Sequence, residues 1–183
     1  MNTAGKLKDF IYAALFAALT ISLGFVSIPV PFSPVPISGI SLGIMLSGSM
    51  LSVRQAVNSV LALILMGAVG LPVFSGFAGG LGVLLGPRGG YYLGFMAGAG
   101  VIAFLRGSNA GLARFFLVNT LGGILIVYLF AVPWLAFVTG MDFCQALAAG
   151  ALPFIIGDLL KAAVASMLAV AVRKHADRFQ TAK

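Results

Sequence analysis

The sequence contains no glutamate, one cysteine and one histidine, and only 8% of its 183 residues are charged. A single cysteine, Cys144, excludes an internal disulfide and a cysteine-based metal cluster. The Walker A and H-E-x-x-H patterns are also missing from the chain. These absences exclude P-loop ATPases and zincin metalloproteases. We therefore expect a protein that is not an enzyme and that holds no metal and no cofactor.

Apolar residues dominate what is present, since 61% of the chain is hydrophobic and the mean hydropathy is +1.12. Soluble domains of this length do not have such a composition. A membrane-spanning helix needs about 20 mostly apolar residues, so the chain can hold roughly six spans with short connections. The net charge of +7 comes from basic residues that separate apolar runs instead of forming a patch. The expected surroundings are a lipid bilayer, not nucleic acid.

We predict an all-α integral membrane protein in which residues 1–183 form a single transmembrane domain of six helices. The spans are predicted near residues 9–28, 37–53, 56–70, 90–105, 112–131 and 147–172. With a cytoplasmic N-terminus, nine of the eleven basic residues lie inside: Lys6, Lys8, Arg54, Arg106, Arg114, Arg173, Lys174, Arg178 and Lys183. The outer connections 28–36 and 132–146 contain no Lys or Arg. This positive-inside pattern predicts that both termini are cytoplasmic.

Two segments cannot form regular helices. Prolines alternate with other residues over 28–36, which removes backbone donors and predicts a stiff, extended outer cap. Residues 70–90 contain eight glycines and two prolines, so we predict an irregular outer loop between the third and fourth spans. Irregular backbone at membrane depth has to be buried in protein or line a polar cavity. We therefore expect a re-entrant or capping loop whose glycines allow close approach of a ligand.

Asp158 and Lys161 lie three residues apart inside the last predicted span, so a helix places them on one face. Charged groups at membrane depth are costly and usually serve a function. The carboxylate can accept N–H groups and the ammonium can donate to a carbonyl, which together suit a cyclic urea or amide. Two alternatives remain open from the residues alone: a structural ion pair, and a pair that relays protons in a small carrier or an intramembrane enzyme.

Arg88 departs from the positive-inside pattern because it lies on the predicted outer side. Its guanidinium is suited to bidentate capture of a carboxylate, although a solvated loop arginine explains the position equally well. Tyr91 and Tyr92 follow directly and are either interfacial aromatics or part of a site wall.

The first predicted span contains two pairs of alanines spaced four residues apart, Ala13 with Ala17 and Ala14 with Ala18. Small residues at this spacing allow another helix to approach closely. Asn58 and Asn119 are polar residues within or near spans, where such side chains more often join helices than contact ligands. We assign neither asparagine a role from the sequence.

Four segments occur in a characteristic order: PVPFSPVPIS at 29–38, GLPVFSGFAGGLGVLLGP at 70–87, GGYYLGF at 89–95 and PFIIGDLLK at 153–161. Together they resemble the BioY family, the biotin-specific substrate-binding S components of energy-coupling factor (ECF) transporters. The resemblance covers nearly the whole chain. It implies a six-helix protein of a bacterial or archaeal cell membrane, with both termini cytoplasmic and a biotin site near the outer face.

The resemblance also implies roles for particular residues. Asp158 and Lys161 match the family's late acidic and basic positions, and Tyr91 matches the aromatic residue of its glycine-rich motif. Arg88 is a candidate for the biotin carboxylate by chemistry alone. Ile40 stands where many relatives have glutamine, which weakens the expectation of a polar ligand contact from the turn after the proline cap.

Transport by such a protein requires partners. The resemblance implies a transmembrane coupling subunit joined to two cytoplasmic ATPases, docked on an alanine face of the first span. We expect Ala14 and Ala18 to form that face, with Ala13 and Ala17 as the alternative. The competing hypothesis is a proton-coupled carrier or intramembrane enzyme that uses Asp158 and Lys161 as a titrating pair.

Overall fold

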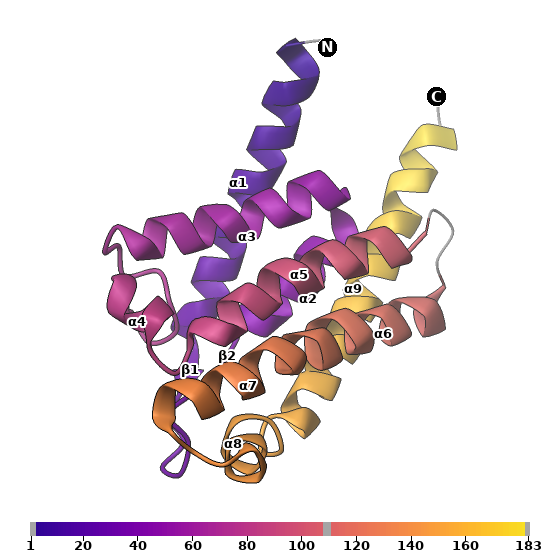
Figure 1. The fold of residues 1–183 in the computed structure, drawn as a ribbon. Helices are drawn as coiled ribbons and strands as arrows, with labels where there is room; N and C mark the ends of the chain where they lie inside the picture. Colours follow the sequence, from indigo (N-terminus) through magenta and orange to yellow (C-terminus); the bar gives the residue numbers. More distant parts are fainter. Residues whose placement is uncertain (1–2, 108–110, 182–183) are drawn as a thin grey trace.

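The computed structural model describes residues 3–107 and 111–181 of the chain, with side chains described for 5–107 and 111–175. Its elements in order are α1 (Thr3–Phe25), β1 (Ser27–Ile28), β2 (Ile37–Ser38), α2 (Ile40–Met50), α3 (Val53–Ala68), α4 (Leu81–Leu85), α5 (Gly89–Leu105), α6 (Leu112–Thr120), the π-helix η1 (Leu121–Ile126), α7 (Val127–Thr139), α8 (Phe143–Gly150) and α9 (Ile155–Thr181). The helices form a bundle, and the start of α1 and the end of α9 project from the same end of it (Figure 1).

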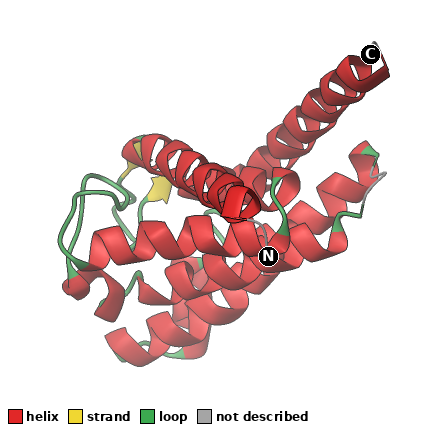
Figure 2. Cartoon of the chain, turned by 90° about the horizontal axis from the view of Figure 1, so that it is seen from above, coloured by secondary structure: helices red, strands yellow, loops and turns green. Residues whose placement is uncertain are grey.

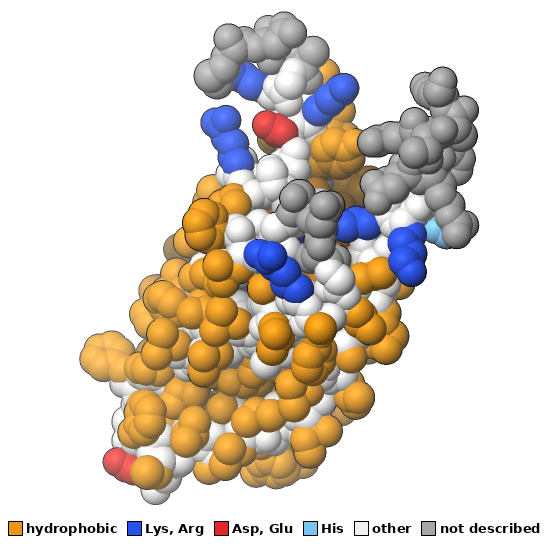
Figure 3. Space-filling model, turned by 90° about the vertical axis from the view of Figure 1, so that its right-hand side faces the viewer, with side chains coloured by type: hydrophobic (Ala, Val, Ile, Leu, Met, Phe, Trp, Pro, Cys, Tyr) orange, Lys and Arg blue, Asp and Glu red, His pale blue; other side chains and the backbone are white. Residues whose placement is uncertain are grey.

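The helices are apolar enough to place this bundle in a membrane. Three helical stretches are long and apolar enough to span a bilayer: Gly5–Phe25, Leu112–Thr139 and Ile155–His175. Three shorter apolar helices, α2, α3 and α5, accompany them. The chain is therefore a multi-pass, mostly helical membrane protein. Hydrophobic side chains cover most of the face in Figure 3, and Lys and Arg side chains gather toward the end where the termini lie.

Helix α2 lies in the interior of the bundle. It packs against α1, α5 and α9, and most of its residues are buried on every side. A helix that is apolar all round is expected at such a central position. This burial places the hydroxyl groups of Ser41, Ser47 and Ser49 inside the protein. Those of Ser41 and Ser49 have a side-chain partner on another element.

Several predicted span boundaries differ from the structure. The first helix ends at Phe25, before the antiparallel pair Ser27–Ile28 and Ile37–Ser38, which brackets the non-helical proline segment. The predicted span 147–172 is interrupted, because α8 ends at Gly150 and α9 begins at Ile155. Pro153 explains the break, since proline lacks an N–H and its ring clashes with the preceding turn. Figure 2 shows the strands among the loops at one side of the bundle.

The fifth span also runs further than predicted. Helix continues from Leu112 to Thr139 through η1, and Pro133 lies inside α7. Membrane helices tolerate proline because neighbouring groups satisfy the freed backbone carbonyl. The predicted outer connection is accordingly shortened, and α8 occupies part of it, beginning at a capping box formed by Asp142 and Gln145.

The glycine-rich segment between α3 and α5 is irregular apart from the short helix α4. Phe74 anchors it: the ring is fully buried, lies 4.4 Å from the ring of Tyr92, and occupies the space beside Gly67 of α3. A Cβ at position 67 would lie 1.9 Å from the Phe74 ring. At its other end, the Trp134 indole N–H donates to the Gly86 carbonyl at 2.9 Å.

A polar cluster of three buried side chains joins α2, α6 and α9. Ser49 Oγ donates to Asn119 Oδ1 at 3.0 Å, and Asn119 Nδ2 donates to Ser166 Oγ at 3.0 Å. Arg106, just after α5, donates to the Ser49 carbonyl. Asn119 therefore joins helices, as polar residues within spans often do. Asn58 is exposed on α3.

Candidate functional site

A cavity of about 50 Å³ lies between the start of α2, the glycine-rich segment, α5, α7 and the start of α9. Its apolar walls come from Val35, Ile37, Phe95, Val127 and Phe154. Polar side chains from five separate parts of the chain reach the same space: Ser38, Ser41, Ser75, Arg88, Tyr91, Tyr128, Asp158 and Lys161.

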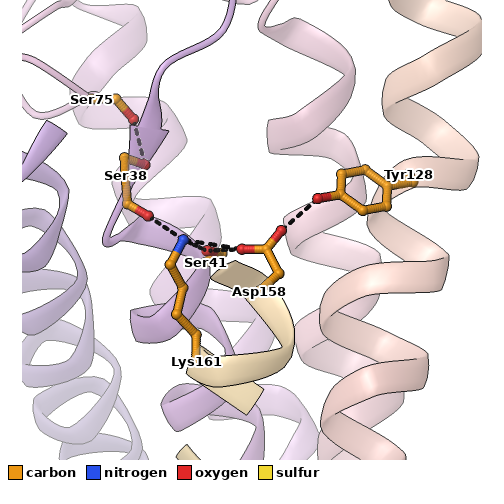
Figure 4. A network of polar contacts seen from close by, with 6 residues as sticks. All are labelled: Ser38, Ser41, Ser75, Tyr128, Asp158 and Lys161. Atoms are coloured by element: carbon orange, nitrogen blue, oxygen red, sulfur yellow. Dashed lines mark hydrogen bonds and ion pairs between the residues drawn. The ribbon is translucent and has the colours of Figure 1, made fainter. Parts of the chain in front are cut away.

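Lys161 and Asp158 form an ion pair at this cavity, as the sequence predicted from their spacing. Lys161 Nζ lies 3.0 Å from Asp158 Oδ1. The ammonium also donates to Ser41 Oγ at 2.9 Å and to the Ser38 carbonyl at 2.8 Å, so all three of its donors are used (Figure 4). The break at Pro153 starts α9 just before this pair. Its first turn therefore points the two charges at the β2–α2 connection.

The Asp158 carboxylate is buried and accepts hydrogen bonds from three sides. Oδ1 accepts from Lys161 and from Ser41 Oγ, each at 3.0 Å, and Oδ2 accepts from the Tyr128 hydroxyl at 2.5 Å. Figure 4 shows Tyr128 approaching from the side of the carboxylate opposite Lys161. Charged and neutral donors around a buried carboxylate hold it in a fixed orientation. Each oxygen has lone pairs that can accept further N–H groups from a ligand.

A chain of hydrogen bonds connects this pair to Arg88. The Ser38 carbonyl accepts from Lys161, and Ser38 Oγ accepts from Ser75 Oγ at 2.9 Å. Arg88 Nη1 donates to the Ser75 carbonyl at 3.3 Å. One guanidinium N–H of Arg88 thus holds the glycine-rich segment, and its side chain lines the cavity.

Tyr91 and Tyr92 are both buried and both line the cavity. The Tyr91 hydroxyl donates to the Gly150 carbonyl at the end of α8, and its ring lies 6.5 Å from Tyr128 in an edge-to-face arrangement. Edge-to-face aromatic pairs stabilise each other and hold both rings in place. Of the two roles that the sequence allowed, the site wall fits this position of Tyr91 better than an interfacial ring.

The structure therefore brings together all four residues that the sequence singled out for ligand contact: Arg88, Tyr91, Asp158 and Lys161. The same cavity is lined by four polar residues that the sequence did not indicate: Ser38, Ser41, Ser75 and Tyr128. Ile40 is fully buried and supplies no polar group, but the next residue, Ser41, does. The turn after the proline cap thus contributes two serines to the cavity lining, and a polar ligand contact from this turn stays a prediction. The hydroxyl groups of Ser38 and Ser41 in this turn are the signal that could have indicated these two residues.

The two alanine pairs of α1 differ in exposure. Ala13 and Ala17 are buried at 4% and 2% exposure, whereas Ala14 and Ala18 are exposed. Residues already packed inside the chain cannot form an external docking face, so the Ala13/Ala17 alternative is not available in this structure. Within residues 3–107 and 111–181, no group of three or more His, Cys, Asp or Glu residues could hold a metal ion.

Comparison with known proteins gives consistent matches along nearly the whole chain. The model of the BioY family matches residues 1–178. The chain is 40% identical over 174 residues to the biotin transporter BioY of Rhizobium etli, covering 90% of this chain and 92% of that protein. It is 36% identical over 168 residues to the biotin transporter BioY of Thermotoga maritima, with coverages of 92% and 97%.

A solved structure has the same fold. The crystal structure of the S component for biotin from an ECF-type ABC transporter superimposes with a TM-score of 0.86. That protein is 31% identical in sequence, and the match covers 95% of each chain.

Proposed function

Since this chain belongs to the BioY family, we propose that it is a biotin-binding S component of an ECF-type vitamin transporter. The family consists of transporter components, not enzymes. The chain captures biotin and leaves the energy-consuming step to other subunits. Because the chain belongs to this family, we prefer this function to the alternative of an intramembrane enzyme or proton-coupled carrier.

The observation that carries the proposal is the Asp158–Lys161 network at a cavity that also has apolar walls. The ureido ring of biotin has two N–H donors and one carbonyl acceptor. A fixed carboxylate matches the donors, and an ammonium matches the acceptor. Lys161 uses all three donors within the protein, so binding exchanges one of these hydrogen bonds for one to the ureido oxygen. The apolar walls suit the sulfur-containing ring and the alkyl chain.

Arg88 is our candidate for the carboxylate of biotin. Its Nη1 is held by the Ser75 carbonyl, which leaves further N–H groups of the planar guanidinium available to a carboxylate. It reaches the cavity from the glycine-rich segment, whereas the ion pair reaches it from α9. We propose that the segment closes over the ligand through this contact.

The proposed topology has six spans, with the helical run α6–η1–α7 counted as one span, and both termini in the cytoplasm. Two structural features support it: the termini project from one end (Figure 1), and the basic side chains gather toward that end (Figure 3). Among the residues used in the charge count, Lys183 lies outside the described residues, and the side chain of Arg178 is not described. The cavity then opens toward the outside of a bacterial or archaeal cell.

Docking to a transmembrane coupling subunit, which is joined to two cytoplasmic ATPases, is proposed to use the exposed Ala14 and Ala18 on α1. Large apolar residues of the same helix are also exposed, including Phe10, Ile11 and Leu15. A close-approach stripe flanked by large apolar side chains suits a helix partner within the bilayer.

The test is calorimetric titration of biotin into the purified, detergent-solubilised chain alone. We expect tight binding by the wild type and a decrease of about 10-fold or more in Asp158→Asn, because a ligand N–H loses its charged acceptor. Asp9→Asn is the matched control, since Asp9 lies on α1 and accepts from Gln55 at 2.6 Å. Absence of binding by a wild-type chain with a cooperative melting transition would overturn the proposal.

A further inference from the structure

The helical run from α6 to α7 buries a residue at every fourth position. These residues are Phe115, Asn119, Gly123, Val127, Ala131 and Leu135. An α-helix turns by about 100° per residue, so steps of four residues drift by about 40° each. We call these six residues the buried stripe. In a regular α-helix its direction would rotate by about 200° over the whole run, so the last residue would point to the opposite face from the first. The π-helix η1 accommodates an extra residue and so removes about half of that drift.

The π-helix is in backbone contact with α5. A Cβ at Gly98 would lie 2.3 Å from the Gly122 carbonyl oxygen, and one at Gly94 would lie 2.8 Å from Val127 Cα. The first distance is about 1 Å shorter than a van der Waals contact. No side chain separates the two helices at these positions, so the position of α5 directly fixes that of η1 and the start of α7.

The residues fixed in this way line the ligand cavity. Gly123, Val127 and Tyr128 all face it, and the Tyr128 hydroxyl donates to Asp158 Oδ2. On the α6 side of η1, the same stripe places Asn119 between Ser49 and Ser166. The π-helix therefore lets one helix serve a structural cluster with its first half and the cavity with its second half.

We propose that the contact of Gly94 and Gly98 with the segment Leu121–Val127 is a positioning device that sets the Tyr128 hydroxyl on Asp158. The inference rests on the proposed function, because it assigns this device to biotin binding. Tyr128 holds Oδ2, Lys161 and Ser41 hold Oδ1, and the carboxylate plane is thereby fixed. A displacement of about 1 Å releases the hydroxyl, and ligand N–H groups then meet a carboxylate that is held at Oδ1 alone.

The test is a double-mutant cycle on Gly98→Ala and Tyr128→Phe, read by biotin calorimetry and by melting temperature. We expect each single variant to bind biotin about 10-fold more weakly. The double variant should be no worse than Tyr128→Phe alone, within about 2-fold, since the two changes break the same hydrogen bond. Gly100→Ala is the matched control on the same helix, because its Cβ would meet only the Val57 side chain at 3.3 Å.

If the losses of biotin affinity in the two single variants multiply in the double variant, Gly98 acts on packing alone and the inference is overturned. Wild-type affinity in Gly98→Ala would also overturn it. If Gly98→Ala does not fold, Gly94→Ala takes its place in the cycle, since its closest contact is less severe. The melting-temperature cycle needs no biotin: Tyr128→Phe should lower the melting temperature in the wild-type background and leave it unchanged in Gly98→Ala. A wild-type chain that fails to bind biotin therefore refutes the proposed function, while the thermal cycle still decides the positioning.

Discussion

At the scale of single residues, the Asp158–Lys161 pair shows how a membrane protein retains two charges in its interior. Every donor of Lys161 is used, and both oxygens of Asp158 accept hydrogen bonds. Buried ion pairs contribute little net stability compared with apolar replacements, but removing one partner leaves an unpaired buried charge. This small net contribution to folding agrees with our proposal that the pair serves ligand binding.

This argument predicts an asymmetry between single and double substitutions. Lys161→Met should destabilise the chain by about 3–5 kcal/mol, because the Asp158 carboxylate loses its cation. The double variant Asp158→Asn with Lys161→Met should recover much of that loss while still binding biotin poorly. Melting temperatures in detergent and biotin calorimetry measure the two effects separately. A double variant as unstable as Lys161→Met would contradict this account of the pair.

Asn119 gives a second prediction at this scale. Asn119→Ala removes the acceptor of Ser49 and one donor to Ser166, so we expect a loss of about 1–3 kcal/mol of stability. Its effect on biotin affinity should be small, since Asn119 does not line the cavity. Asn58→Ala, on the exposed face of α3, is the control and should melt like the wild type. A normal melting temperature for Asn119→Ala would show that the cluster is dispensable.

The sequence indicates the cavity-lining residues whose type is rare in a membrane span, but not those whose type is common. Asp158 and Lys161 are conspicuous because charge is costly at that depth. Tyr128 lies in an otherwise apolar run, and nothing local separates a buried tyrosine from an interfacial one. Ser41 directly follows Ile40, and the comparison with relatives considered only Ile40. Only the fold, which brings residues 41, 128 and 158 together, identifies these partners.

At the scale of elements, the buried side chain of Phe74 anchors the glycine-rich segment. The buried Phe74 ring occupies the space that a side chain at Gly67 would need, and the ring also packs on Tyr92 at the cavity. Phe74 therefore connects α3 with the cavity wall. The composition of the segment predicted an irregular backbone, but this anchor depends on a contact between two elements and could not be predicted from it.

We predict that Gly67→Ala expels the Phe74 ring, because the added methyl would lie 1.9 Å from it. Displacing a buried phenylalanine should cost about 1–3 kcal/mol and weaken biotin binding by loosening the segment. The comparison variant is Gly82→Ala on α4, where nothing lies within 4 Å of the new Cβ. Calorimetry and thermal melting on both variants decide the matter. Equal behaviour of the two would mean that Phe74 does not anchor the segment.

Element boundaries were less predictable than element existence, for identifiable reasons. Pro153 breaks the last predicted span, whereas Pro133 lies within α7 without ending it. The same residue type thus has opposite effects, and the neighbouring helices decide between them. The hydropathy of the sequence likewise does not indicate the π-helix at Leu121–Ile126. The burial of every fourth residue along α6–η1–α7 is a consequence of this π-helix.

At the scale of the whole molecule, composition alone predicted a helical membrane protein, since no other class combines 61% hydrophobic residues with 8% charged residues. The arrangement of charges extends this to an orientation. Basic side chains gather toward the end with the termini, while α8 lies at the opposite end (Figures 1 and 3). In the topology that we propose from the positive-inside rule, α8 lies outside the cell.

The single cysteine makes this orientation testable without first engineering the chain. Cys144 is exposed on α8, so a membrane-impermeant maleimide should label it in intact cells. In Cys144→Ser with Lys174→Cys, the thiol lies in the part of α9 near the C-terminal end, and we expect labelling only after the membrane is permeabilised. Labelling of Lys174→Cys in intact cells would place the basic end outside. The cavity would then face the cytoplasm, where a protein that captures biotin from the medium could not use it.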